Sequence, residues 1–152
     1  MARECVVDTT VLQKANAALT APPREHALFR HRVRLLGHIR DGQLTVLMSD
    51  RLLAEYRRQV KSPRNDYIRA FFEILDDPTR HTRNWEKRWG GGRQEPARKC
   101  RYPEHDDHVL RTAIRPGNNT TIFSEDKRML DADACIYGHF RVHIHDPSRI
   151  DG

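Results

Sequence analysis

Short apolar runs alternate with longer helix-like stretches along this chain of 152 residues, and this alternation limits the folds open to it. Four runs have the length and the apolar or β-branched character of buried strands: residues 5–7, 44–48, 120–123 and 142–144. Strands that alternate with helices predict an α/β fold. We expect three layers, with a mainly parallel twisted sheet flanked by helices.

Helices are expected between these strands wherever apolar residues recur at helical spacing. Ser49 is an expected N-cap, and Gly42 is expected to end the helix before it. The expected helices cover residues 9 to about 19, 23–40, 50 to about 61, 65–75, about 105–114, and 126 to about 130. The length suits a single domain over residues 1–152.

The segment from about 77 to 104 differs from the rest because it has no clear periodicity. Between Arg80 and Arg101 it carries eight basic and only two acidic residues, so it accounts for the whole formal net charge of +6. Loops of this length are uncommon in compact domains unless they have a function. We therefore expect a neutral body with one long basic insertion loop.

Three further features bear on the location of the protein. The cysteines are odd in number and widely spaced (Cys5, Cys100 and Cys135), which argues against a disulfide framework. No apolar run approaches the roughly 20 residues of a membrane span, and the first residues do not resemble a signal peptide. These features predict a cytoplasmic protein without a membrane partner.

Acidic residues stand at the ends of several predicted elements. Asp8 closes the first strand, Asp126 follows the strand at 120–123, and Glu55 lies on the helix after the second strand. Asp106 and Asp107 open a later helix. A single acid in such a place is more often a cap, but carboxylates that converge at one strand edge would repel each other unless they bind a cation. Oxygen-only ligands favour Mg²⁺ or Mn²⁺.

Five motifs in order along the chain resemble those of the PIN-domain ribonucleases, and within them the VapC-type toxins. The chain has VVDTTVL at 6–12, SDRLLAE at 49–55, DHVLRTA at 107–113, IFSED at 122–126 and VHIHDP at 142–147. They are similar to the family's opening strand with its acid, its second acidic helix, its third acidic helix, its strand with Ser and Asp, and its last strand.

The resemblance implies an endoribonuclease that depends on Mg²⁺ or Mn²⁺. Its catalytic and metal-binding acids would be Asp8, Glu55, Asp107 and Asp126, and its products would carry 5′-phosphate and 3′-hydroxyl ends. The residues that orient these carboxylates would be Thr10, Ser124 and Asp106. Asp106 competes with Asp107 for the third position, and Glu125 is either a further ligand or a helix-start charge.

The basic segment combines cations with aromatic side chains, a mixture that suits single-stranded or looped RNA. The predicted RNA-binding residues are Arg83, Trp85, Arg88, Trp89, Arg93, Lys99 and Arg101, with Tyr102 as a further aromatic group. One alternative is a solvated loop whose tryptophans pack on the body. Another is a docking site for an antitoxin.

Two groups of cysteine and histidine raise the question of zinc. The first contains Cys100, His105 and His108, and the second contains Cys135, His139, His143 and His145. Neither has the full paired spacing of a zinc motif, so structural zinc is not predicted.

The leading hypothesis is thus a toxin that cleaves RNA, with an antitoxin protein as partner and a homodimer as the expected assembly. A PIN nuclease of RNA processing or antiviral defence is the second hypothesis. An inactive PIN-like module that binds RNA or protein is the third, and the presence of all four acids speaks against it.

Overall fold

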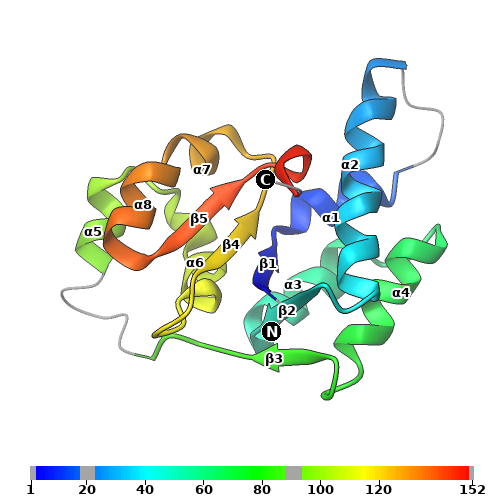
Figure 1. The fold of residues 1–152 in the computed structure, drawn as a ribbon, viewed down its shortest axis with the longest axis horizontal. Helices are drawn as coiled ribbons and strands as arrows, with labels where there is room; N and C mark the ends of the chain where they lie inside the picture. The colour runs from blue at the N-terminus through cyan, green and yellow to red at the C-terminus, as the bar shows by residue number, and fades with distance from the viewer. Residues whose placement is uncertain (1–2, 18–22, 88–93, 151–152) are drawn as a thin grey trace.

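The computed structural model describes residues 3–17, 23–87 and 94–150 (Figure 1). Its strands are β1 (Arg3–Val7), β2 (Leu44–Met48), β3 (His81–Arg83), β4 (Thr120–Phe123) and β5 (Val142–His145). They form one sheet in the order β3-β2-β1-β4-β5, and every neighbouring pair is parallel. The prediction of an α/β fold with a parallel sheet is therefore confirmed.

Helices flank this sheet and make the fold three-layered. Their bounds are α1 (Thr9–Ala15), α2 (Pro23–Arg40), α3 (Asp50–Gln59), α4 (Asp66–Leu75), α5 (Gln94–Lys99), α6 (Asp107–Ala113), α7 (Lys127–Asp131) and α8 (Asp133–Phe140), with short 3₁₀ helices η2 (Glu104–Asp106) and η3 (Pro147–Arg149). In Figure 1, α2 and α4 lie at one end of the molecule, and α5, α7 and α8 lie at the other.

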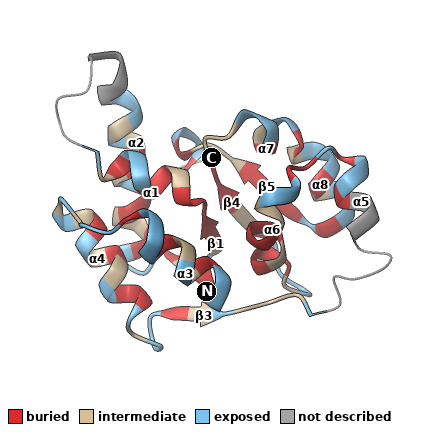
Figure 2. Cartoon of the chain, turned by 180° about the vertical axis from the view of Figure 1, so that it is seen from behind, coloured by how far each residue is buried: buried red, intermediate tan, exposed pale blue. Residues whose placement is uncertain are grey.

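The central strand shows that both faces of the sheet are covered. Successive side chains of a strand point to opposite faces, yet Cys5, Val6 and Val7 are all fully buried. α6 packs against β1, β2 and β4, while α2 packs against β2 and α8 against β5. Figure 2 shows the buried residues gathered on the strands and on the helix faces that meet them.

The residues predicted to begin and end helices, Ser49 and Gly42, do so. The Ser49 side chain accepts a 3.2 Å hydrogen bond from the amide of Leu52 and so caps α3. Gly42 follows α2 with a φ of +81°, a conformation that glycine adopts without strain. Within the described ranges, no helix is both long and apolar enough to cross a membrane.

The region from 77 to 104 contains more regular structure than predicted. β3 pairs with β2 at the edge of the sheet, and α5 lies further along. Both are short and polar. Because β3 is held by backbone hydrogen bonds rather than by an apolar face, the hydrophobic pattern did not predict it.

α8 was also missed, and the first helix is shorter than expected. α8 buries only Ile136 and Phe140, so its sequence carries little helical periodicity. α1 ends at Ala15, whereas the prediction extended to about residue 19, which lies outside the described residues.

Candidate active site

The ends of two central strands bring Asp8 and Ser124 to the same edge of the sheet. β1 and β4 pair in parallel with Val7 opposite Phe123, so the residues that follow these two also lie side by side. The backbone amide of Asp8 donates to the carbonyl of Phe123 at 2.9 Å. α1 begins directly after Asp8, which makes this edge the start of a helix as well.

Asp8 is the most enclosed of the predicted acids, with 3% of its surface exposed. Its Oδ2 accepts hydrogen bonds from Thr10 Oγ1 at 2.9 Å and from Ser124 Oγ at 2.8 Å. Burial nevertheless raises the pKa of Asp8, and the charges of Glu55 and Asp126 act in the same direction. A bound cation would relieve this repulsion.

Glu55 points from α3 toward the same edge and is held at both carboxylate oxygens. Thr9 Oγ1 donates to Oε1 at 2.5 Å, and Nε2 of the buried His108 pairs with Oε2. Burial works against ionisation here, but the hydrogen bonds from His108 and Thr9 outweigh it, so the pKa of Glu55 lies below its ordinary value. Glu55 therefore remains a carboxylate at neutral pH.

Asp126 is joined to Asp8 through the hydroxyl group of Ser124. The amide of Asp126 donates to Ser124 Oγ at 3.0 Å, while Ser124 Oγ donates to Asp8. One oxygen of Asp126, Oδ1, caps α7 by accepting from the amides of Arg128 at 2.8 Å and Met129 at 3.4 Å. The capping interaction fixes the direction of the carboxylate.

Asp106 interacts electrostatically with Asp8 and Asp126. Burial raises its pKa to about 6, and the charges of Asp8 and Asp126 add to this rise. His105 and His108 act in the opposite direction. A carboxylate oxygen of Asp106, one of Asp126 and a ring nitrogen of His105 lie within 4.8 Å of one another.

The third acidic position was assigned to Asp107, with Asp106 as the alternative. Asp107 is the first residue of α6 and is half-buried, and its charge acts on the buried Tyr102. Asp106 is coupled by charge to Asp8 and Asp126. Asp107 as the third ligand, with Asp106 as the alternative, stays a prediction.

Glu125 is engaged by side chains of α1 and α2. Arg32, which is buried, donates to both of its carboxylate oxygens at 2.7 Å, and Lys14 Nζ lies 3.8 Å from Oε1. A bidentate arginine pair is among the stronger contacts available to a carboxylate. The sequence suggested that Glu125 is a further ligand or a helix-start charge. Neither interpretation predicted this ion pair, which joins the β4–α7 connection to α2.

The predicted RNA-binding residues differ in how accessible they are. Lys99, Arg101 and Arg83 are exposed, and Arg83 also forms an ion pair with Asp50. Trp85 is half-buried, and the guanidinium carbon of Arg111 lies 4.2 Å from its ring centroid, so one ring face is already covered. The other three predicted residues, Arg88, Trp89 and Arg93, lie outside the described residues.

Tyr102 is not available for stacking on bases, and this expectation was wrong. Its ring is buried, and its hydroxyl donates to the carbonyl of Asp106 at 2.7 Å. Burial, followed by the charges of Asp106, Asp8 and Asp107, raises its pKa well above the ordinary value. Tyr102 therefore supports the backbone that carries Asp106.

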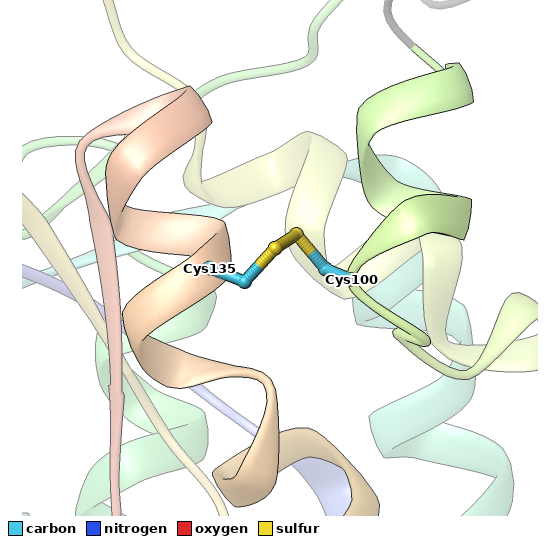
Figure 3. Close-up of a disulfide and its surroundings, with 2 residues drawn as sticks. All are labelled: Cys100 and Cys135. Atoms are coloured by element: carbon cyan, nitrogen blue, oxygen red, sulfur yellow. A yellow bond between two sulfur atoms is a disulfide. The ribbon is translucent and has the colours of Figure 1, made fainter.

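A disulfide joins Cys100, directly after α5, to Cys135 on α8 (Figure 3). The expectation that the cysteines would not form a disulfide framework was wrong for this pair. α5 and α8 pack together, which brings two cysteines 35 positions apart to a Cα–Cα distance of 5.5 Å. Cys5 is free and buried. The cysteine count consequently gives no support to the predicted cytoplasmic location.

Sequence reasoning missed three residues that hold the site together. Thr9 and His108 position Glu55, and Arg32 binds Glu125. Thr9 follows Asp8 directly, and His108 lies beside the acids at 106 and 107, so proximity to the motifs was the available signal. Arg32 offered no such signal, because its partner Glu125 is 93 positions away in the sequence.

No model of a known protein family matches this chain, and no curated protein matches it. The resemblance to PIN-domain ribonucleases therefore rests on the quoted motifs alone.

Proposed function

We propose that this protein is a divalent-metal-dependent endoribonuclease whose active site lies at the carboxyl edge of the sheet, around Asp8. The observation that carries the proposal is the mutual charge effect among its acids. Burial raises the pKa of both Asp106 and Asp8; the charges of Asp8 and Asp126 add to the rise for Asp106, and those of Glu55 and Asp126 add to it for Asp8. Carboxylates that repel one another where they are buried or half-buried are suited to a cation.

The residues fit Mg²⁺ or Mn²⁺ because the groups that would hold the ion are carboxylates: Asp8, Glu55, Asp106 and Asp126. When bound, such an ion activates water and neutralises charge on the scissile phosphate. Thr10 and Ser124 hold Asp8 through its Oδ2. Thr9 and His108 hold Glu55 ionised and oriented.

The exposed cations Lys99 and Arg101 would contact the phosphates of the substrate. Arg101 lies five positions before Asp106, and Tyr102 joins the two stretches through its hydrogen bond to the Asp106 carbonyl. If Lys99 and Arg101 bound the RNA backbone, they would bring a phosphodiester toward carboxylates that would otherwise repel it. RNA as the substrate, the toxin role, the antitoxin partner and the homodimer are inferences from the family resemblance.

The direct test is cleavage of a structured RNA by the purified chain with Mg²⁺ or Mn²⁺, and then with excess EDTA. We expect cleavage that yields 5′-phosphate ends, that stops with EDTA and that is abolished in Asp8→Asn. Glu73→Gln is the matched control, because Glu73 is an exposed acid on α4. Cleavage that persists in EDTA would refute the mechanism, and absence of cleavage by the folded wild type would favour a binding module.

A further inference from the structure

A second group of potential metal ligands lies between α8 and the edge strand β5. Asp133 is the first residue of α8, and His143 and His145 occupy alternate positions of β5. One ligand atom from each of the three side chains lies within 4.8 Å of the other two. All three residues are half-buried.

The distances between ligand atoms in this group are slightly longer than those in a metal site that holds its ion. Asp133 Oδ1 lies 3.4 Å from His143 Nδ1, and Asp133 Oδ2 lies 3.9 Å from His145 Nε2. Ligands in a tetrahedral zinc site with bonds of about 2.0–2.1 Å are about 3.3 Å apart. Both distances from Asp133 to the histidines therefore exceed this spacing by less than 1 Å.

The surrounding structure holds two of the three side chains in place. Asp133 Oδ1 accepts a 2.7 Å hydrogen bond from the amide of Ile144, which leaves Oδ2 to face His145. The His143 ring stacks on Tyr137, with 3.9 Å between centroids and 12° between planes. Ligands that are already oriented lose little freedom on binding an ion.

His143 also carries an unsatisfied polar atom at this point. Its Nδ1 is buried and makes no hydrogen bond among the described residues. Buried ring nitrogens of histidine normally have a partner, and one that faces a carboxylate and a second imidazole is placed to bind a metal.

We propose that Asp133, His143 and His145 form a second metal site, selective for Zn²⁺ and similar ions. Two imidazoles and one carboxylate favour such borderline ions over Mg²⁺, which prefers oxygen ligands. Three protein ligands leave a fourth position for water. Burial lowers the pKa of His145, the charge of Arg149 acts in the same direction, and the charges of Asp133 and, more weakly, Asp146 oppose it.

The site explains why spacing along the sequence did not predict zinc. Cys135, expected in the same group, is bonded to Cys100, and His139 is exposed on α8. The third ligand is Asp133, ten positions before His143, and only the packing of α8 on β5 brings it to the histidines. The ion would fasten the start of α8 to the edge strand.

The test uses the full chain without reductant, so that the disulfide stays closed, and in millimolar Mg²⁺, which occupies the carboxylate site around Asp8. Zn²⁺ is titrated by calorimetry, and Tm is measured with and without Zn²⁺. We expect one equivalent to bind and to raise Tm. His143→Gln, His145→Gln and Asp133→Asn should each weaken the Zn²⁺ Kd at least about tenfold.

His139→Gln is the matched control, since it removes an exposed histidine from the same helix, and it should bind Zn²⁺ like the wild type. Unchanged affinity in both His143→Gln and His145→Gln would overturn the proposal. So would Zn²⁺ binding that is lost only in Asp8→Asn, because the ion would then occupy the carboxylate site.

A spectroscopic measurement on the wild type keeps the test independent of whether variants fold. X-ray absorption at the zinc edge counts the imidazoles around the ion. Two imidazoles with oxygen ligands are expected. An all-oxygen shell or a single imidazole would contradict the assignment.

Discussion

Ser124 donates a 2.8 Å hydrogen bond to Asp8, a residue 116 positions earlier in the chain. The same hydroxyl oxygen accepts from the amide of Asp126 at 3.0 Å. One serine hydroxyl directly after β4 thus links the Asp8 carboxylate to the backbone of Asp126, two acids of the candidate active site. Because β1 and β4 are paired in register, this link follows from the sheet itself.

The identity of the third acid can be decided by paired substitutions. Asp106→Asn should reduce metal-dependent RNA cleavage by at least about 100-fold, since it removes a carboxylate coupled to Asp8 and Asp126. Asp107→Asn should retain most of the activity. Initial cleavage rates at saturating Mn²⁺ measure both. If Asp107→Asn is the inactive variant, the assignment must be reversed.

Stability without metal should depend on pH through Asp106. The pKa of this group is raised to about 6 in the folded protein, so the folded state binds a proton more readily than the unfolded chain. The free energy of unfolding should therefore rise as pH falls from about 7 to about 5. Urea denaturation in EDTA measures it, and Asp106→Asn should flatten the dependence. Equal slopes in both proteins would show that Asp106 does not titrate in this range.

The exposed cations at the end of α5, Lys99 and Arg101, should control the salt dependence of RNA binding. We expect Lys99→Ala and Arg101→Asn to weaken binding and to reduce the slope of log K against log salt by about 0.7 per lost contact with a single strand. Asparagine suits position 101 because Arg101 has a φ of 61°. Arg57→Ala, on α3, is the control and should leave the slope unchanged. An unchanged slope in all three would exclude contact between this segment and phosphate.

The disulfide should be a major source of stability for the α5–α8 end of the molecule. Closing a loop with a sequence separation of 35 residues is worth about 3–4 kcal/mol from chain entropy. Cys135→Ser should lower the free energy of unfolding by that order, as should reductant added to the wild type. Reductant should have no effect on Cys135→Ser. A wild type whose unfolding is insensitive to reductant would show that the bond contributes nothing.

The sheet and most helices could be predicted because their signals are local. Cys5 to Val7 form an apolar strand ending at an acid, and Ser49 and Gly42 mark helix ends through their own side-chain or backbone chemistry. β3 and α8 carry few buried apolar residues, so the pattern on which prediction depends is nearly absent from them.

The candidate active site, too, could be predicted from the sequence only in part. Asp8, Thr10 and Ser124 were predicted from short motifs, and the structure joins them by hydrogen bonds. The choice between Asp106 and Asp107 could not be made from helical register. The position of Asp106 depends on η2, a short 3₁₀ helix ahead of α6, and on the hydrogen bond from Tyr102 to the Asp106 carbonyl.

The most direct measurement is calorimetric titration of Mn²⁺ into the wild type, Asp8→Asn and Glu73→Gln at pH 7.5. If the acids around Asp8 form a metal site, the wild type and Glu73→Gln will bind Mn²⁺ alike, and Asp8→Asn will bind at least about 100-fold more weakly. Circular dichroism confirms that the variants are folded. Equal Mn²⁺ affinity in wild type and folded Asp8→Asn would contradict the central claim.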